Sequence, residues 1–121
     1  VPTPTPTPAL QVDTAKANAI IAQVNKERAD NGLPPLTVDG SLSSACVSHA
    51  KEVAQAGRAY HAANPGGCEY VEKCPASKPG GSIGATVPVH VSQFMTESIT
   101  HIGAGVVTID GYSYIVVRGR Q

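Results

Sequence analysis

The chain has few aromatic residues and no excess of charge of either sign. Of its 121 residues, one is Phe, four are Tyr and none is Trp, so few rings can stack on bases or sugars. Lys and Arg number 9, as do Asp and Glu, which leaves a formal net charge of zero and no basic stripe. No apolar run approaches the roughly 20 residues of a membrane span. We therefore expect no nucleic-acid partner and no transmembrane segment, and a lectin-like function is disfavoured.

The first residues are dominated by one repeated dipeptide. Residues 1–8 alternate Pro with Thr, and because proline fixes φ and disfavours helix in the residue before it, this tract is extended. Such tracts are typical of spacers at the start of exported domains. The chain does not begin with Met and shows no signal-peptide pattern, so we expect a processed or trimmed product. We predict a spacer over residues 1–12 and one domain over residues 13–121.

The spacing of apolar residues predicts a first helix directly after the spacer. Asp13 or Thr14 can cap it, and Asn31-Gly32 supplies a glycine where helices commonly end. Ile20, Ile21 and Val24 fall at helical intervals between these ends.

A second helix is predicted after the Asp39-Gly40 turn. Ser41 or Ser43 can cap it, and Gly57 ends it. His49 falls on or beside its apolar stripe, where we expect a hydrogen-bonded core histidine rather than a metal ligand.

The C-terminal third of the chain predicts a third helix followed by a hairpin. The helix would begin near Thr86 and Pro88 and continue to Ser98. The β-branched runs 102–107 and 112–117 are joined by Asp110-Gly111, which is a strong hairpin signal. Residues 68–84 between these parts show no convincing periodicity, and so long a loop is usually functional or held by a disulfide.

The chain has 3 cysteines, an odd number that leaves at least one thiol outside any intramolecular disulfide. Cys68 and Cys74 lie in the same glycine-rich stretch, and we favour a disulfide between them. The alternative is a bond from Cys46 to Cys68. Without a CxxC motif or a Cys/His cluster, a structural zinc site is not expected.

Several motifs, taken in order, resemble the CAP superfamily of cysteine-rich secretory, antigen 5 and pathogenesis-related-1 proteins, in its short bacterial form. The motifs are Asn25-x-x-Arg28, the run Gly32-Leu33-Pro34-Pro35-Leu36-Thr37-Val38-Asp39, Leu42-x-x-Ala45-x-x-x-His49-Ala50, and Gly57-x-x-x-His61. The resemblance implies an α+β fold: an α-β-α sandwich with a small, largely antiparallel central sheet flanked by about three helices. It also implies a secreted or cell-envelope location.

The resemblance implies a cleft containing two histidines and two acids. His61 matches the first histidine, and Glu69 matches the first acid, although its neighbours differ from the usual Gly-Glu-Asn. Glu97 matches the second acid in Phe94-Met95-Thr96-Glu97, with Phe in place of Trp. His101 fits the second histidine by spacing.

The position of His101 leaves two alternatives open. Relatives place a further turn or strand between the second histidine and the glycine-rich strand, and here none intervenes. Either His101 serves on a shortened connection, or the histidine segment is lost and His101 only leads into the strand. If the predicted third helix continues through His101, Glu97 and His101 share a face, because residues four apart stack on a helix.

Three functions remain open from the sequence. The favoured one is a secreted or envelope binding module, expected to be a monomer, for a lipid, sterol or glycan or for an envelope protein. The second is a metal-assisted hydrolase using His61, Glu69, Glu97 and His101, with zinc or another divalent metal held by His61 and His101. The third is a structural surface domain without a working cleft. The sequence contains no Gly-x-Ser-x-Gly or HExxH motif, so we lean away from an enzyme and predict no required cofactor.

Overall fold

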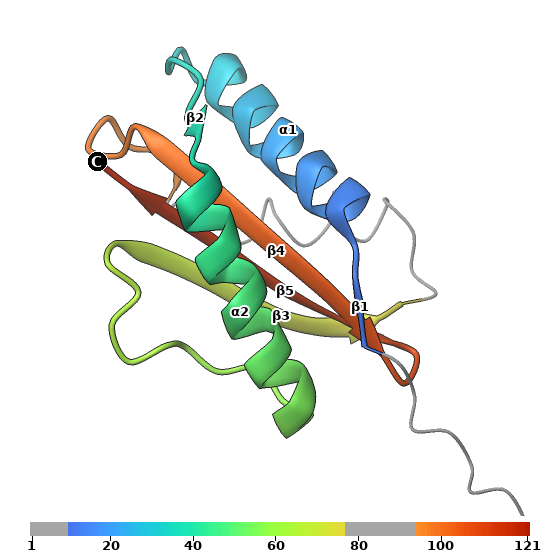
Figure 1. The fold of residues 1–121 in the computed structure, drawn as a ribbon. Coiled ribbons are helices and arrows are strands. Elements are labelled where there is room, and N and C mark those ends of the chain that lie inside the picture. The colour runs from blue at the N-terminus through green and yellow to red at the C-terminus, as the bar shows by residue number, and fades with distance from the viewer. Residues whose placement is uncertain (1–9, 77–93) are drawn as a thin grey trace, which may run out of the picture.

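The fold is a central β-sheet with one helix on each face (Figure 1). We describe residues 10–76 and 94–121 of a computed structural model. In chain order the elements are β1 (Gln11–Val12), α1 (Thr14–Asp30), β2 (Thr37–Val38), α2 (Gly40–Ala56), β3 (Cys68–Pro75), β4 (His101–Ile109) and β5 (Tyr112–Arg120). The α+β fold and the α-β-α sandwich are therefore confirmed, with two helices in the described residues rather than about three.

The sheet is largely antiparallel. Its order is β1-β4-β5-β3, and β2 pairs in parallel with β4. The predicted hairpin is confirmed, because β4 and β5 pair along their full length around a turn at Asp110-Gly111. Both turn residues have positive φ, which the two-residue hairpin turn requires. The register places Glu69 of β3 opposite Arg118 of β5, which matters for the site described below.

Each helix contributes one apolar layer. From α1, Ile20 and Val24 pack with Ile102 and Val106 of β4 on one face of the sheet. From α2, Cys46, Ala50 and Val53 pack with Val107 and Val116 on the other. The core is built largely of aliphatic side chains, and Phe94 joins the α1 layer at 2% exposure. None of the helices in the described ranges is long and apolar enough to span a membrane.

Two glycines in β4 determine how closely α2 lies against the sheet. A Cβ built on Gly103 would come within 2.5 Å of the backbone nitrogen of Ser43. A Cβ on Gly105 would collide with the backbone of Val47. The helix backbone therefore rests directly on the strand, and any larger side chain at these positions would push it away.

The Asn25-x-x-Arg28 motif connects α1 to the segments on either side of it. Asn25 exchanges two hydrogen bonds with the backbone of Leu36, at 3.3 and 2.8 Å. Arg28 is only 1% exposed and donates to the carbonyls of Pro34, Phe94 and Thr96. Because a buried guanidinium needs acceptors for its fixed fork of N–H groups, these carbonyls explain why an arginine occupies this position.

Four local predictions need correction or qualification. Asp13 caps α1, as one of our two alternatives stated, but α2 is capped by Asp39 rather than by Ser41 or Ser43. The last residues of the predicted spacer, Gln11–Val12, form β1. Part of the predicted loop 68–84 is strand β3. The third helix fails over residues 94–98, which form turns, and the rest of that prediction lies outside the described residues.

Candidate functional site

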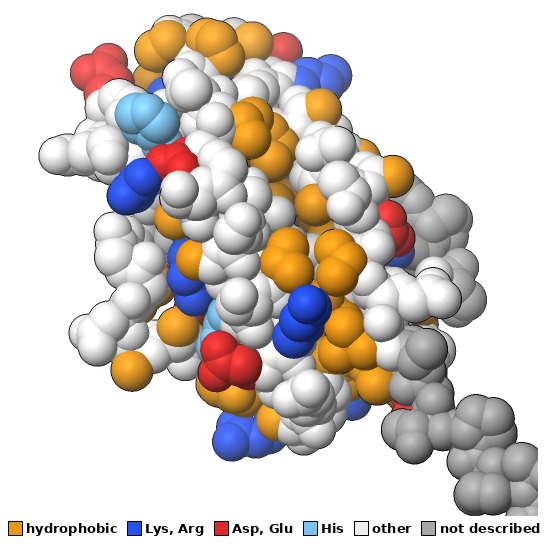
Figure 2. All heavy atoms as spheres, in the orientation of Figure 1, with side chains coloured by type: hydrophobic (Ala, Val, Ile, Leu, Met, Phe, Trp, Pro, Cys, Tyr) orange, Lys and Arg blue, Asp and Glu red, His pale blue; other side chains and the backbone are white. Residues whose placement is uncertain are grey.

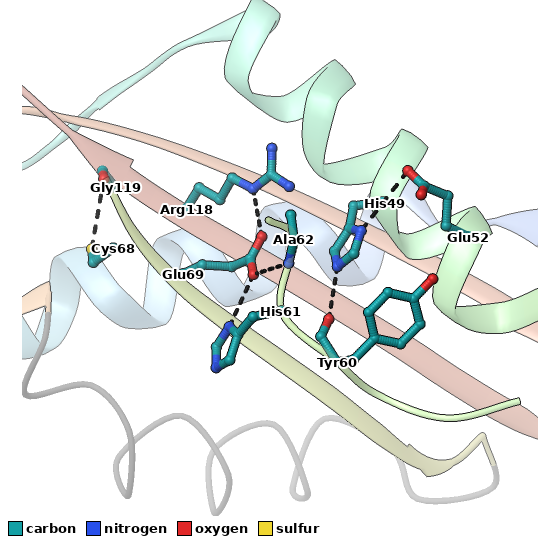
Figure 3. A network of polar contacts seen from close by, with 9 residues as sticks. All are labelled: His49, Glu52, Tyr60, His61, Ala62, Cys68, Glu69, Arg118 and Gly119. Atoms are coloured by element: carbon teal, nitrogen blue, oxygen red, sulfur yellow. Dashed lines mark hydrogen bonds and ion pairs between the residues drawn. The ribbon is translucent and has the colours of Figure 1, made fainter. Parts of the chain in front are cut away.

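The structure brings His61 and Glu69 together, as the resemblance implied. His61 lies in the loop 57–67 that follows α2, and Glu69 is the second residue of β3. Nδ1 of His61 lies 2.9 Å from Oε1 of Glu69 (Figure 3). Because a carboxylate oxygen only accepts, Nδ1 is the donor. The His61 side chain remains 69% exposed, whereas that of Glu69 is 1% exposed.

The carboxylate of Glu69 receives two further hydrogen bonds. The backbone N–H of Ala62 donates to Oε1 at 2.9 Å, and Nε of Arg118 donates to Oε2 at 2.8 Å. Arg118 is itself buried and comes from the middle strand β5. Burial alone would raise the pKa of Glu69, but the hydrogen bonds from Ala62, Arg118 and His61 outweigh it and hold the pKa below its ordinary value. Glu69 is therefore a buried anion with both oxygens engaged.

A second histidine fixes the same loop to α2. His49 is 3% exposed, and its Nε2 donates to the carbonyl of Tyr60 at 2.7 Å. The two rings pack edge to face, with centroids 5.3 Å apart. Figure 3 shows His49 and Glu69 contacting adjacent parts of the loop. The prediction of a hydrogen-bonded core histidine is confirmed, and the loop is attached on both sides of His61.

Cys46 of α2 is fully buried close to this array. Burial raises the pKa of its thiol to about 12, against a smaller opposing effect of Arg118. A thiol with such a pKa carries almost no thiolate at neutral pH, so it cannot act as a nucleophile there.

Glu97 and His101 do not form the pair that a third helix continuing through them would give. Glu97 is exposed in a turn, next to the Phe94–Thr96 stretch that Arg28 holds against the end of α1. His101 instead begins β4, where its Nδ1 is hydrogen-bonded to Oγ1 of Thr100 at 2.8 Å. No ion pair or hydrogen bond within the described residues joins either of them to His61 or Glu69. The structure thus assembles half of the expected cluster.

The described side chains do not fit the zinc site considered above. Within residues 10–76 and 94–121, no three His, Cys, Asp or Glu side chains are grouped so that they could hold a metal. The carboxylate of Glu69 already accepts hydrogen bonds from three donors, one of which is Nδ1 of His61. A divalent ion needs several converging ligands, and here only Nε2 of His61 remains available.

The array can nevertheless orient an imidazole. A buried carboxylate that accepts from Nδ1 fixes the tautomer and turns Nε2 outward, as in a general-base dyad. Hydrolysis would also need a nucleophile and oxyanion donors. None of the described residues forms a hydrogen bond with Nε2 of His61, so the described part of the chain contains the dyad without its nucleophile.

The predicted disulfide between Cys68 and Cys74 is not confirmed. No disulfide joins any two of the three cysteines. Cys68 and Cys74 lie on the same strand six residues apart, which separates their Cα atoms by about 20 Å. A disulfide spans about 6 Å between Cα atoms. The alternative bond from Cys46 is blocked by the sheet, because Cys46 lies on the α2 face and Cys68 packs on the α1 face.

Sequence reasoning missed Arg118, although the chain carried a signal for it. Arg118 directly follows the apolar run Ile115–Val117, which ends the second predicted strand of the hairpin. Arginine is almost never buried without a partner, so this position required a carboxylate nearby. The identity of that carboxylate depended on the pairing of β3 with β5, and β3 itself was not predicted.

Comparisons with known proteins agree with this geometry. The model of the CAP family, described as the cysteine-rich secretory protein family, matches residues 21–118. The fold is similar to that of an outer surface protein of Borrelia burgdorferi, with a TM-score of 0.71 at 13% identity over 93% of this chain and 99% of that one. It is also similar to a cysteine-rich secretory protein of Staphylococcus aureus, with a TM-score of 0.52 at 12% identity over 90% of this chain and 39% of that one.

These findings establish the family. The chain belongs to the CAP family, because the family model covers most of its length, including all of α2 and the His61–Glu69 pair. No curated protein sequence matches the chain at a significant level. At 12–13% identity the two structural neighbours establish the fold and not the activity.

Proposed function

We propose that this chain is a secreted or cell-surface binding module of the CAP type, in which the His61–Glu69–Arg118 array holds the loop 57–67 and does not perform hydrolysis. The observation that carries the proposal is the state of Glu69. Its buried carboxylate accepts from Ala62 and His61 at Oε1 and from Arg118 at Oε2, so both oxygens are engaged in holding the loop and the arginine.

The burial of Arg118 strengthens this interpretation. Its side chain is 9% exposed, and leaving a guanidinium buried without a carboxylate costs several kcal/mol. Glu69 is therefore bound to Arg118 as a structural ion pair. A role for Glu69 as the general base itself would require it to change protonation state beside a permanent cation, which the cation opposes.

A location outside the cell is supported by two independent features. The Thr/Pro tract of residues 1–8 is typical of spacers in exported proteins. The two structural neighbours are named as an outer surface protein and a cysteine-rich secretory protein. The ligand we propose is a small lipid, sterol or glycan or an envelope partner.

The proposal is tested by measuring binding and turnover on the same preparation. Equilibrium dialysis with palmitate, cholesterol and an N-acetylglucosamine tetrasaccharide should give saturable binding of at least one probe. Chromogenic esters, peptides and phosphoesters, with and without zinc, should give no turnover beyond that of His61→Ala. Turnover that His61→Ala abolishes would overturn the proposal in favour of the hydrolase.

A further inference from the structure

The outer edge of β4 is covered at its two ends and open in the middle. β2 pairs with it at His101 and Ile102, and β1 pairs with it at Val107 and Thr108. Between these short strands lies a groove of about 310 Å³. Figure 1 shows β4 passing between α1 and α2, and Figure 2 shows apolar side chains at the surface between the two helices.

We infer that this groove binds a small neutral ligand that has an apolar body and one N–H or O–H group. The inference rests on the proposed binding function and names a site and a ligand class for it. The groove is separate from the His61–Glu69 array, because its lining comes from β1, β4 and the first turns of both helices.

The groove has an apolar lining of small and branched side chains. Ala17 of α1, Val47 of α2 and Val106 of β4 contribute to it, and Val12 of β1 stands at its end. Val12 is 45% exposed, one of the few large apolar side chains of the described residues that is not covered. A volume of this size and an apolar lining are typical of small-molecule sites, at the small end of their range.

The inner wall also presents a buried backbone acceptor. Along β4, the carbonyls of Ile102 and Val106 accept N–H groups from the residues that follow β2 and β1, at 2.9 and 2.8 Å. Ala104 lies midway between them, so the two-residue period of the strand turns its N–H and C=O to the same open edge. Its N–H donates to Oγ of Ser43 at 3.3 Å. None of the described residues donates to its C=O.

This carbonyl defines the polar requirement on the ligand. Ala104 is 4% exposed, and a buried backbone carbonyl is almost always paired with a donor. A ligand that brings an N–H or O–H satisfies it, whereas a ligand without a donor leaves it unpaired at a cost in affinity.

The remaining polar groups favour a neutral ligand. Thr14, Asn18 and Ser44 line the groove with exposed hydroxyl and amide groups, which suit either donors or acceptors. The one charged side chain in the lining is Asp13, and its carboxylate accepts from the backbone N–H of Lys16 as the helix cap. An anion would be repelled by this carboxylate and by the Ala104 carbonyl. A cation would exchange its hydration for an apolar wall and a carboxylate already engaged in the helix cap.

Two matched probes test the ligand class. Cyclohexanol and cyclohexanone have the same ring and differ in whether the oxygen carries a proton. In a titration followed by backbone amide NMR of the full chain, cyclohexanol should shift the resonances of Ala17, Val47 and Ala104. Cyclohexanone should bind at least about fivefold more weakly, because it cannot donate to Ala104. Equal affinities would overturn the inference.

Two matched variants test the location. Ser44→Phe places a ring in the groove from an exposed helix position and should abolish the cyclohexanol shifts. Ser48→Phe makes the same change at an exposed position of α2 outside the groove and should leave them intact. Unchanged binding by Ser44→Phe, or no shifts in the wild type, would overturn the groove. Shifts centred on other residues would also overturn it, yet would leave the proposed binding function standing.

Discussion

Glu69 is the residue on which the polar contacts near the loop 57–67 converge. It joins the loop through Ala62 and His61 to the middle of the sheet through Arg118. One carboxylate therefore stabilises the position of a loop, an imidazole and a buried guanidinium at once.

Replacing Glu69 by Gln should destabilise the protein strongly. The amide cannot balance the charge of Arg118, and removing one partner of a buried ion pair costs about 3 kcal/mol or more. Urea denaturation at pH 7 would measure the loss in the free energy of unfolding. Glu97→Gln is the matched control: its side chain is exposed, so its effect should stay within about 0.5 kcal/mol. Similar effects of the two variants would contradict this account of Glu69.

The depressed pKa of Glu69 predicts the pH range of its contribution. A carboxyl whose folded pKa lies below its unfolded value stabilises the fold above the unfolded pKa, here 4.5. That stabilisation is lost as the pH falls through the folded pKa. The difference in unfolding free energy between the wild type and Glu69→Gln should therefore be full at pH 6 and shrink steadily below pH 4.5. A difference that stays constant or grows on acidification would show that the charge of Glu69 is not what stabilises the array.

At the scale of the elements, the contact of α2 with β4 depends on glycine. Gly105→Ala should cost about 2–3 kcal/mol, because the added Cβ meets helix backbone that cannot move independently of the core. Gly40→Ala is the control, since a Cβ there meets nothing within 4 Å. Thermal unfolding of both variants would measure the difference. If Gly105→Ala is as stable as Gly40→Ala, the close approach of α2 is not a constraint on the fold.

The elements that the sequence predicted well are those with local signals. α1 and α2 have caps, glycine stops and an apolar stripe, and the β4–β5 hairpin has its Asp110-Gly111 turn. β3 has no such local signal. Apolar and polar residues are mixed along it, and glycine and proline lie at its ends. It exists through pairing with β5, whose partner residues lie 37 to 51 positions away in sequence. Pairings of this kind are set by tertiary contacts that local propensity does not contain.

The candidate site, like the fold, was predictable only where it depended on local signals and not on tertiary pairing. The family resemblance singled out His61 and Glu69, and the structure brings these two side chains together. Arg118 was missed, since its partner is fixed by the β3–β5 register. Glu97 and His101 do not share a helix face, because the helix on which that alternative depended is absent from residues 94–98.

At the scale of the whole molecule, the structure describes a CAP domain with two separate surfaces of interest. One is the loop 57–67 with the exposed imidazole of His61, attached through Glu69 to the α2 face of the sheet. The other is the groove at the open edge of β4. We propose binding without hydrolysis for the molecule as a whole, because Glu69, the only acid near His61 in the described residues, forms an ion pair with Arg118.

Zinc titration followed by thermal unfolding tests this claim most directly. The wild type and His61→Ala would be melted with and without saturating zinc, because an ion that binds only the folded state raises the melting temperature. Our account predicts that zinc changes both melting temperatures equally. A rise in the wild type that His61→Ala abolishes would contradict it and would make His61 a metal ligand.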